Sequence, residues 1–197
     1  MRIIVVGATG TIGKAVVDAL SRRHEILGVS KQSTPITVDL ANPESIKAMY
    51  KKTGILDAVI STAGLAKFNS LSKLSDGDFE LGLSNKLMGQ VNLVRFGFDH
   101  VRDNGCFVLT SGILARLPMP GSAAISLVNA GIEGFARAAA IEAPRGIRVN
   151  VVSPPWVTET LKALGMDPAN GLPAAEVAKA YVRAIEGNEN GAVIEPT

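Results

Sequence analysis

The fold is decided by the stretch IIVVGATGTIG, residues 3–13. Its first four residues are apolar and β-branched, which is typical of a strand buried on both faces of a parallel sheet. Glycines at positions 7, 10 and 13 then lead into a predicted helix over residues 11–22. The strand, the GxxGxxG turn and the helix together form a variant of the dinucleotide-binding fingerprint.

Each glycine of this loop has its own role in the fingerprint. Gly7 permits the tight turn, Gly10 lets the backbone approach a pyrophosphate, and Gly13 lets the helix pack closely on the sheet. The helix start offers free N–H groups and a partial positive charge, which suit a phosphate. The alternative is a merely tight turn. We predict a nucleotide-binding loop with contacts from Gly7, Thr9, Gly10, Thr11, Ile12 and Gly13.

The rest of the chain alternates strand and helix signals. Further strands are expected at residues 25–29, 36–38, 57–60, 107–110, 147–152 and 192–194. Helices are expected at 42–53, 77–102, 121–142 and 173–186. This alternation predicts the α/β class, with residues 1–197 forming a single domain: one doubly wound, Rossmann-like parallel sheet of about seven strands flanked by helices. Such sheets bind ligands beyond the carboxyl ends of their strands.

Composition excludes several classes of function. Hydrophobic residues make up 47% and charged residues 19% of the chain, and the net charge is +2 with both signs interspersed. We therefore expect no nucleic-acid or membrane partner. One cysteine, Cys106, and two distant histidines argue against a metal site. No apolar run has the length of a membrane span or a signal-peptide core, so a cytoplasmic location is expected.

The end of the second strand bears on the choice of cofactor. NAD-binding proteins usually place an acid there for the ribose 2′-hydroxyl, but this chain has Gly28-Val29-Ser30-Lys31. Ser30 and Lys31 suit a 2′-phosphate, which favours NADP; NAD is the less favoured alternative. Asp39, at the end of the third strand, is expected to reach the adenine amino group.

Several further stretches identify a family. The chain resembles the short-chain dehydrogenase/reductase family in its glycine loop, in Asp39-Leu40, in Ser61-Thr62-Ala63-Gly64 where the family has Asn-Asn-Ala-Gly, and in PRGIRVN (144–150) followed by Ser153-Pro154-Pro155. The resemblance implies a nicotinamide cofactor. It adds Leu40, Ser61, Thr62, Ala63, Gly64 and Pro154 to its contacts, and Thr158 by a looser match to the threonine that bonds the nicotinamide amide. It also implies a homodimer or homotetramer assembled through helices 77–102 and 121–142.

The family's catalytic Tyr-x-x-x-Lys pair is missing. Neither Tyr50 nor Tyr181 is followed by a lysine four residues later, and no lysine lies between positions 86 and 162. Alignment puts Ile125 at the tyrosine position, Asn129 at the lysine position and Gly112 at the serine position. Ile125 cannot transfer a proton, whereas Asn129 retains the ability to bond the ribose.

Two residues are candidates for rebuilt chemistry. The family's helix asparagine aligns with Lys86 or, by a different anchor, with Asn85. Lys86, with a pKa lowered by burial, is a candidate proton donor, and Ser111 is a candidate for orienting the substrate. Three functions remain open: an NADP-dependent oxidoreductase acting on a small carbonyl or alcohol, a catalytically silent NADP(H)-binding sensor or scaffold, and a nucleotide-binding isomerase or lyase. Fold cannot choose among them.

Overall fold

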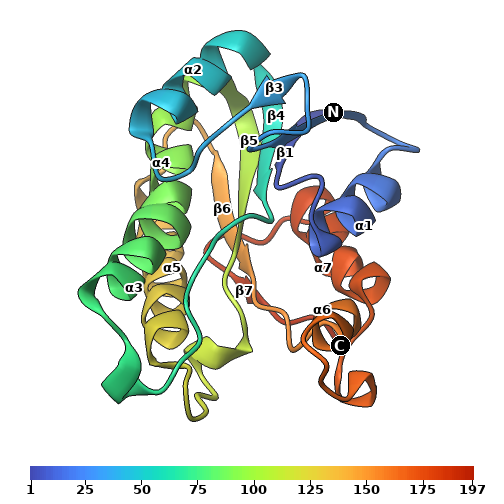
Figure 1. Ribbon diagram of the computed structural model, residues 1–197. Helices are drawn as coiled ribbons and strands as arrows, with labels where there is room; N and C mark the ends of the chain where they lie inside the picture. The colour runs from blue at the N-terminus through green and yellow to red at the C-terminus, as the bar shows by residue number, and fades with distance from the viewer.

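The computed structural model describes residues 1–197 and contains one seven-stranded parallel sheet in the order β3-β2-β1-β4-β5-β6-β7 (Figure 1). The predicted doubly wound, Rossmann-like sheet is confirmed. The strands are β1 (Arg2–Val6), β2 (Glu25–Ser30), β3 (Ile36–Thr37), β4 (Leu56–Ser61), β5 (Val101–Thr110), β6 (Arg148–Val152) and β7 (Val193–Ile194).

Helices cover both faces of the sheet. On one side Figure 1 shows α2 (Pro43–Thr53), α3 (Asp76–Leu81), α4 (Met88–Gly97) and α5 (Ala123–Glu142). On the other side lie α1 (Thr11–Leu20), α6 (Thr158–Ala163) and α7 (Ala174–Glu186). Short 3-10 turns occupy Leu71–Lys73, Phe98–His100, Ile113–Ala115 and Pro168–Asn170.

The strands are apolar throughout because both of their faces are buried. In β1, Ile4 and Val6 enter the core shared with α2, α4 and α5, whereas Ile3 and Val5 enter the core shared with α1 and α7. Successive side chains of a strand point to opposite faces, so a run without alternation of polarity is required here. The expectation of a central strand at residues 3–6 is thereby confirmed.

The start of α2 follows its sequence signals. Asn42 caps the helix, and its side-chain oxygen accepts hydrogen bonds from the backbone N–H groups of Glu44 and Ser45. Pro43 occupies the first helical position, where its missing N–H costs nothing. Cap and proline together fix where this helix begins.

The predicted helix over 77–102 is wrong as a single element. It is divided into α3, a π-helical turn at Gly82–Leu87, α4 and a 3-10 turn, and β5 already begins at Val101. A pattern read with a period of 3.6 residues does not register a wider turn, which shifts every later side chain around the helix axis. This interruption matters because Asn85 and Lys86 lie inside it.

The helix α5 is the one helix with the length and hydropathy of a membrane span, and one of its faces packs on the sheet. Ile132, Ala136 and Ala139 of α5 lie in the core beside β6. On the outer side, exposed apolar residues include Leu81, Met88, Leu127 and Ile141. Assembly through these helices stays a prediction, as does the cytoplasmic location.

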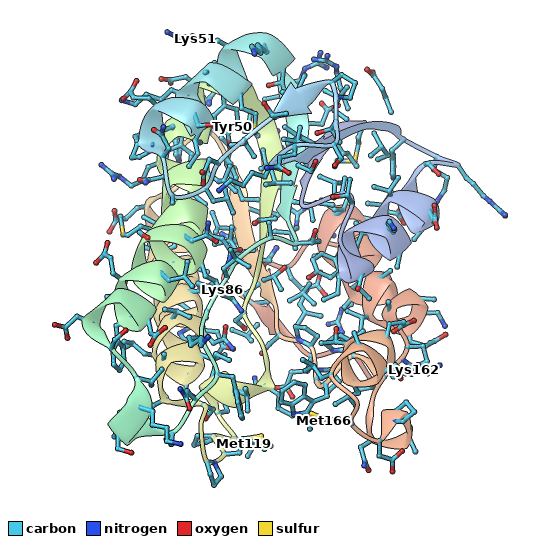
Figure 2. The ribbon with its side chains drawn as sticks, in the orientation of Figure 1. Tyr50, Lys51, Lys86, Met119, Lys162 and Met166 are labelled. Carbon is cyan, nitrogen blue, oxygen red and sulfur yellow. The ribbon has the colours of Figure 1, made fainter.

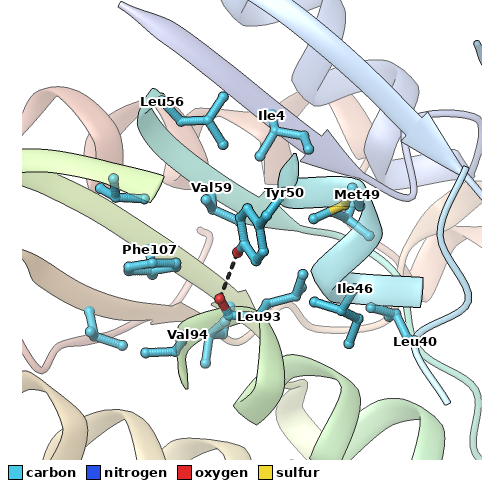
Figure 3. Close-up of a cluster of buried hydrophobic side chains, with 14 of the residues drawn as sticks. Ile4, Leu40, Ile46, Met49, Tyr50, Leu56, Val59, Leu93, Val94 and Phe107 are labelled. Atoms are coloured by element: carbon cyan, nitrogen blue, oxygen red, sulfur yellow. Dashed lines mark hydrogen bonds between the residues drawn. The ribbon is translucent and has the colours of Figure 1, made fainter. Parts of the chain in front are cut away.

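Tyr50 links α2 to α4 inside the core. Its hydroxyl is fully buried and donates a 2.6 Å hydrogen bond to the carbonyl of Leu93 (Figure 3), and its ring stacks on His100. Losing this hydrogen bond would leave the carbonyl oxygen of Leu93 buried without a donor, which costs stability.

We expect Tyr50→Phe to lower the free energy of unfolding by about 1 kcal/mol, because it removes one buried hydrogen bond without changing the packing volume. Thermal unfolding followed by circular dichroism should show a melting temperature lower by roughly 2–4 °C. Lys51→Ala, at an exposed position of the same helix, is the control and should have little effect. An unchanged melting temperature for Tyr50→Phe would contradict the role of this bond.

Candidate functional site

The glycine loop is built by close backbone contacts between β1 and α1. A Cβ added at Gly13 would lie 2.0 Å from the carbonyl oxygen of Gly7, and Gly7 itself has a φ of +90°. Gly10 precedes α1 and brings no side chain to cap its first N–H groups. These amides are therefore available to an anion, as the sequence predicted for a phosphate.

A cleft of about 330 Å³ opens in front of this loop and gathers residues from four strand ends. Most of the predicted cofactor contacts line it: Gly7, Thr9, Gly10, Ser30, Lys31, Asp39, Leu40, Thr62, Ala63 and Gly64. Val6, Val38, Leu65 and Asn85 complete its walls. The cleft thus joins the glycine loop, at the end of β1, to the ends of β2 and β3 on one side of β1 and of β4 on the other.

Other predicted contacts lie outside the cleft. Ile12 packs against the core beneath α1, and Thr11 faces a neighbouring groove on the α1 side. Ser61 is fully buried below the cleft. Thr158 begins α6 and does not line the cleft; its backbone N–H donates to the carbonyl of Leu172.

Charged groups at the far end of the cleft form a pair. The ammonium of Lys31 lies 2.8 Å from a carboxylate oxygen of Asp39, and this bond holds the pKa of Asp39 below its usual range. The other oxygen of Asp39 accepts the N–H of Ala41. The Ser30 hydroxyl accepts the N–H of Ser33 and pairs with Thr34, so Lys31 is the group there with capacity for a new anion.

A second pocket of about 180 Å³ lies beyond the ends of β5 and β6. Asn129, 2% exposed, lines it from α5. Its amide nitrogen lies 3.4 Å from the carbonyl oxygen of Gly112, while its side-chain oxygen is buried without any partner. If the amide group of Asn129 were turned over, its oxygen would face the carbonyl oxygen of Gly112, and neither atom has a hydrogen to donate. The unpartnered atom is therefore the side-chain oxygen of Asn129. A buried acceptor without a donor marks a place where a ligand hydroxyl fits.

Glu133 is a buried residue at the site that the sequence reasoning missed. It is 5% exposed, and one carboxyl oxygen accepts hydrogen bonds from the hydroxyls of Ser111, at 2.7 Å, and Ser153, at 3.0 Å. It thereby ties the ends of β5 and β6 to α5. The spacing of Asn129 and Glu133, four residues apart on an otherwise apolar helix face, was the available signal.

Lys86 approaches the site from the π-helical turn, on the α3–α4 side of the sheet (Figure 2). Its stem packs against Gly64, where a Cβ would lie 2.6 Å from the Lys86 side chain. Its ammonium lies 3.4 Å from the carbonyl oxygen of Ser111, at the end of β5. Burial lowers the pKa of Lys86 to about 8.

Asn85, the neighbour of Lys86, has a different task. Its side-chain oxygen accepts the N–H of Leu65 at 2.9 Å and so holds the loop that follows β4. Asn85 and Lys86 are the two residues that align with the family's helix asparagine, and their side chains lie in different places. Asn85 lines the cleft, whereas the Lys86 ammonium lies at the end of β5.

We expect Lys86→Met to stabilise the protein at neutral pH. Because the folded-state pKa of about 8 lies below the usual 10.5, the unfolded chain binds the extra proton more readily between these values. In the wild type, burial of the charged Lys86 therefore lowers the free energy of unfolding by its full amount below pH 8, and this destabilisation disappears as the pH rises from 8 toward 10.5. The gain on substitution should be on the order of 1–3 kcal/mol at pH 7 and smaller at pH 10.

Denaturant unfolding at the two pH values measures this difference. Lys162→Met, at an exposed lysine, is the control and should show no such pH dependence. A gain for Lys86→Met that is equal at both pH values would contradict a shifted pKa.

A family model described as enoyl-(acyl carrier protein) reductase matches residues 6–194. The chain belongs to the short-chain dehydrogenase/reductase family. It is 30% identical over 167 residues to hydroxynaphthalene reductase arp2 of Aspergillus fumigatus, covering 79% of this chain and 61% of that protein. It is 28% identical over 141 residues to oxidoreductase UcpA of Escherichia coli K12, covering 68% and 54%. The chain thus spans little more than half the length of these relatives.

Solved structures of similar size share the whole fold. The protein lin1944 from Listeria innocua is 38% identical, with a TM-score of 0.95 over 100% of both chains. A small-chain dehydrogenase is 26% identical, with a TM-score of 0.86 over 99% of this chain and 95% of that one. A further small-chain dehydrogenase, solved in complex with NADPH, is 24% identical with a TM-score of 0.87 over 99% and 95%, and shows the fold alone.

Proposed function

We propose that this short-chain dehydrogenase/reductase is an NADP(H)-dependent oxidoreductase that acts on a small carbonyl or alcohol substrate with a non-standard proton donor. The observation that carries the proposal is the glycine loop with its uncapped helix start, which opens onto a cleft lined by the ends of β1 to β4. The similar fold solved with NADPH supports the choice of cofactor.

The residues of the site fit a nicotinamide dinucleotide. The amides after Gly10 would hold the diphosphate, Lys31 the 2′-phosphate, and the orphaned oxygen of Asn129 a hydroxyl of the nicotinamide ribose. When bound as NADPH, the cofactor supplies the hydride for the carbonyl carbon, and the products are NADP⁺ and an alcohol.

Lys86 is the candidate that would protonate the substrate oxygen. With a pKa of about 8 it carries its proton at neutral pH and releases it more readily than an ordinary lysine. Its ammonium is held by a single carbonyl contact at the end of β5, beside the second pocket. The Ser111 hydroxyl donates its hydrogen bond to Glu133, and its oxygen can still accept a hydrogen bond from the hydroxyl of an alcohol substrate.

A specific observation favours a catalytically silent NADP(H)-binding sensor or scaffold as the second candidate. Ile125 lies in the second pocket, where the family's tyrosine is expected from the alignment, and Asn129 replaces the charged lysine. An arrangement without these two groups retains binding while losing the usual proton transfer. The two candidates differ in whether Lys86 performs chemistry.

Cofactor preference is tested by titrating the protein with NADPH and NADH and following cofactor fluorescence. We expect NADPH to bind more tightly, and Lys31→Ala to weaken NADPH binding by about 10-fold, or about 1.4 kcal/mol, with little change for NADH. The reason is that only NADPH carries the phosphate that Lys31 would contact. Lys14→Ala, a lysine of α1 outside the cleft, is the matched control. Equal weakening of both cofactors would overturn the assignment of Lys31.

The proton donor is tested with a panel of small ketones and aldehydes and NADPH oxidation as the readout. We expect Lys86→Met to lower kcat by about 10²- to 10⁴-fold, the usual contribution of a general acid, while NADPH affinity is unchanged. Lys162→Met should match the wild type. Activity that survives in Lys86→Met would end the proposal for this residue, and a wild type inactive on the whole panel would favour the sensor.

A further inference from the structure

The pocket beyond β5 and β6 contains no ionisable side chain. Eleven residues line its volume of about 180 Å³. Three of them, Ser111, Asn129 and Thr160, have polar side chains without charge. Its apolar walls are formed by Ile113, Leu114, Ile125, Pro155, Trp156 and Val157. The neighbouring cofactor cleft, in contrast, contains the charged pair of Lys31 and Asp39.

The free polar atoms of Ser111 and Asn129 in this pocket are acceptors, and the Thr160 hydroxyl can donate or accept but carries no charge. The Ser111 hydroxyl has its proton directed to Glu133, which leaves oxygen lone pairs for a ligand. The unpartnered atom of Asn129 is likewise an oxygen. The carboxyl group of Glu133 lies directly behind Ser111. An anion entering the pocket would lose its water and meet no cation in the lining, because the Lys86 ammonium lies outside it, at the carbonyl oxygen of Ser111. Burial of an anion among the lining residues is therefore unfavourable.

The size of the pocket is set by backbone contacts. The carbonyl of Trp156 accepts the N–H of Leu172 at 2.8 Å, and Val157 pairs with Leu172 in an isolated parallel bridge. The wall that carries Trp156 is therefore anchored to a second segment of the chain. An apolar cavity of about 150 Å³ holds a benzene molecule, so this pocket matches one ring-sized group.

We propose that this pocket selects a neutral, apolar, ring-sized carbonyl compound or alcohol and rejects carboxylates of the same size. The inference deepens the proposed oxidoreductase function and rests on it for the chemistry. Its binding preference is measurable without any turnover.

Trp156 is the only tryptophan of the chain, so intrinsic fluorescence reports on this pocket. The full chain is titrated, with and without NADP⁺, with cyclohexanecarboxamide and with cyclohexanecarboxylate, which have nearly the same shape. We expect the neutral amide to change the fluorescence and to bind at least about 10-fold more tightly than the anion. A carboxylate that binds equally or better, or an amide without effect up to its solubility limit, would overturn the proposal.

A charge placed on the pocket wall provides a second test. Thr160→Lys should reduce the preference for the amide over the carboxylate by about 10-fold, because it supplies a cation within the lining itself. Thr160→Gln, of similar length and without charge, should keep the wild-type preference. If both variants keep the wild-type preference for the amide, charge is not the basis of selection and the proposal is overturned. Circular dichroism checks that both variants are folded.

Turnover separates this inference from the proposed function. Cyclohexanone and 4-oxocyclohexanecarboxylate are each supplied with NADPH, and we expect only the neutral ketone to be reduced efficiently. Selective amide binding without reduction of either ketone would remove the redox function and leave the pocket assignment standing. Equal reduction of both ketones would support the redox function and overturn the selectivity.

Discussion

The contact between Gly13 and the carbonyl of Gly7 is the constraint on which the rest of the structure depends. No side chain fits there, because even a Cβ would lie 2.0 Å from that oxygen. This approach seats the start of α1 directly over the end of β1, which lies between β2 and β4 in the sheet. The cleft for a dinucleotide exists because these three neighbouring strand ends are brought together around the glycine loop.

A second set of contacts fixes the other half of the site. Side chains from two helices reach consecutive carbonyls at the end of β5: Lys86 approaches that of Ser111, and Asn129 approaches that of Gly112. Glu133 then joins β5 to β6 through two serine hydroxyls. The usual tyrosine and lysine of the family are missing, yet the strand ends are held by other polar groups. What remains for a ligand is an apolar pocket with acceptors and one lysine near its edge.

The sequence predicted the fold and most of the residues that line the cleft, because both rest on local patterns. The glycine loop, the apolar strands and the capped start of α2 follow from residues that are neighbours in the chain. The helix expected at 77–102 was wrong because the π-helical turn breaks the period on which that expectation rested. Ser61 and Thr158 lie outside the cleft because motif position alone does not say which way a side chain faces.

By itself, the sequence determined the alternation of strands and helices, the loop suited to a diphosphate and the absence of a Tyr-x-x-x-Lys pair, since each is a matter of residue type and spacing. Only the tertiary structure decided that Lys31 is paired with Asp39, that Ser111 donates to Glu133 and that the oxygen of Asn129 has no partner. These contacts join residues from different strands and helices. Their geometry depends on how the elements pack, which no local pattern contains.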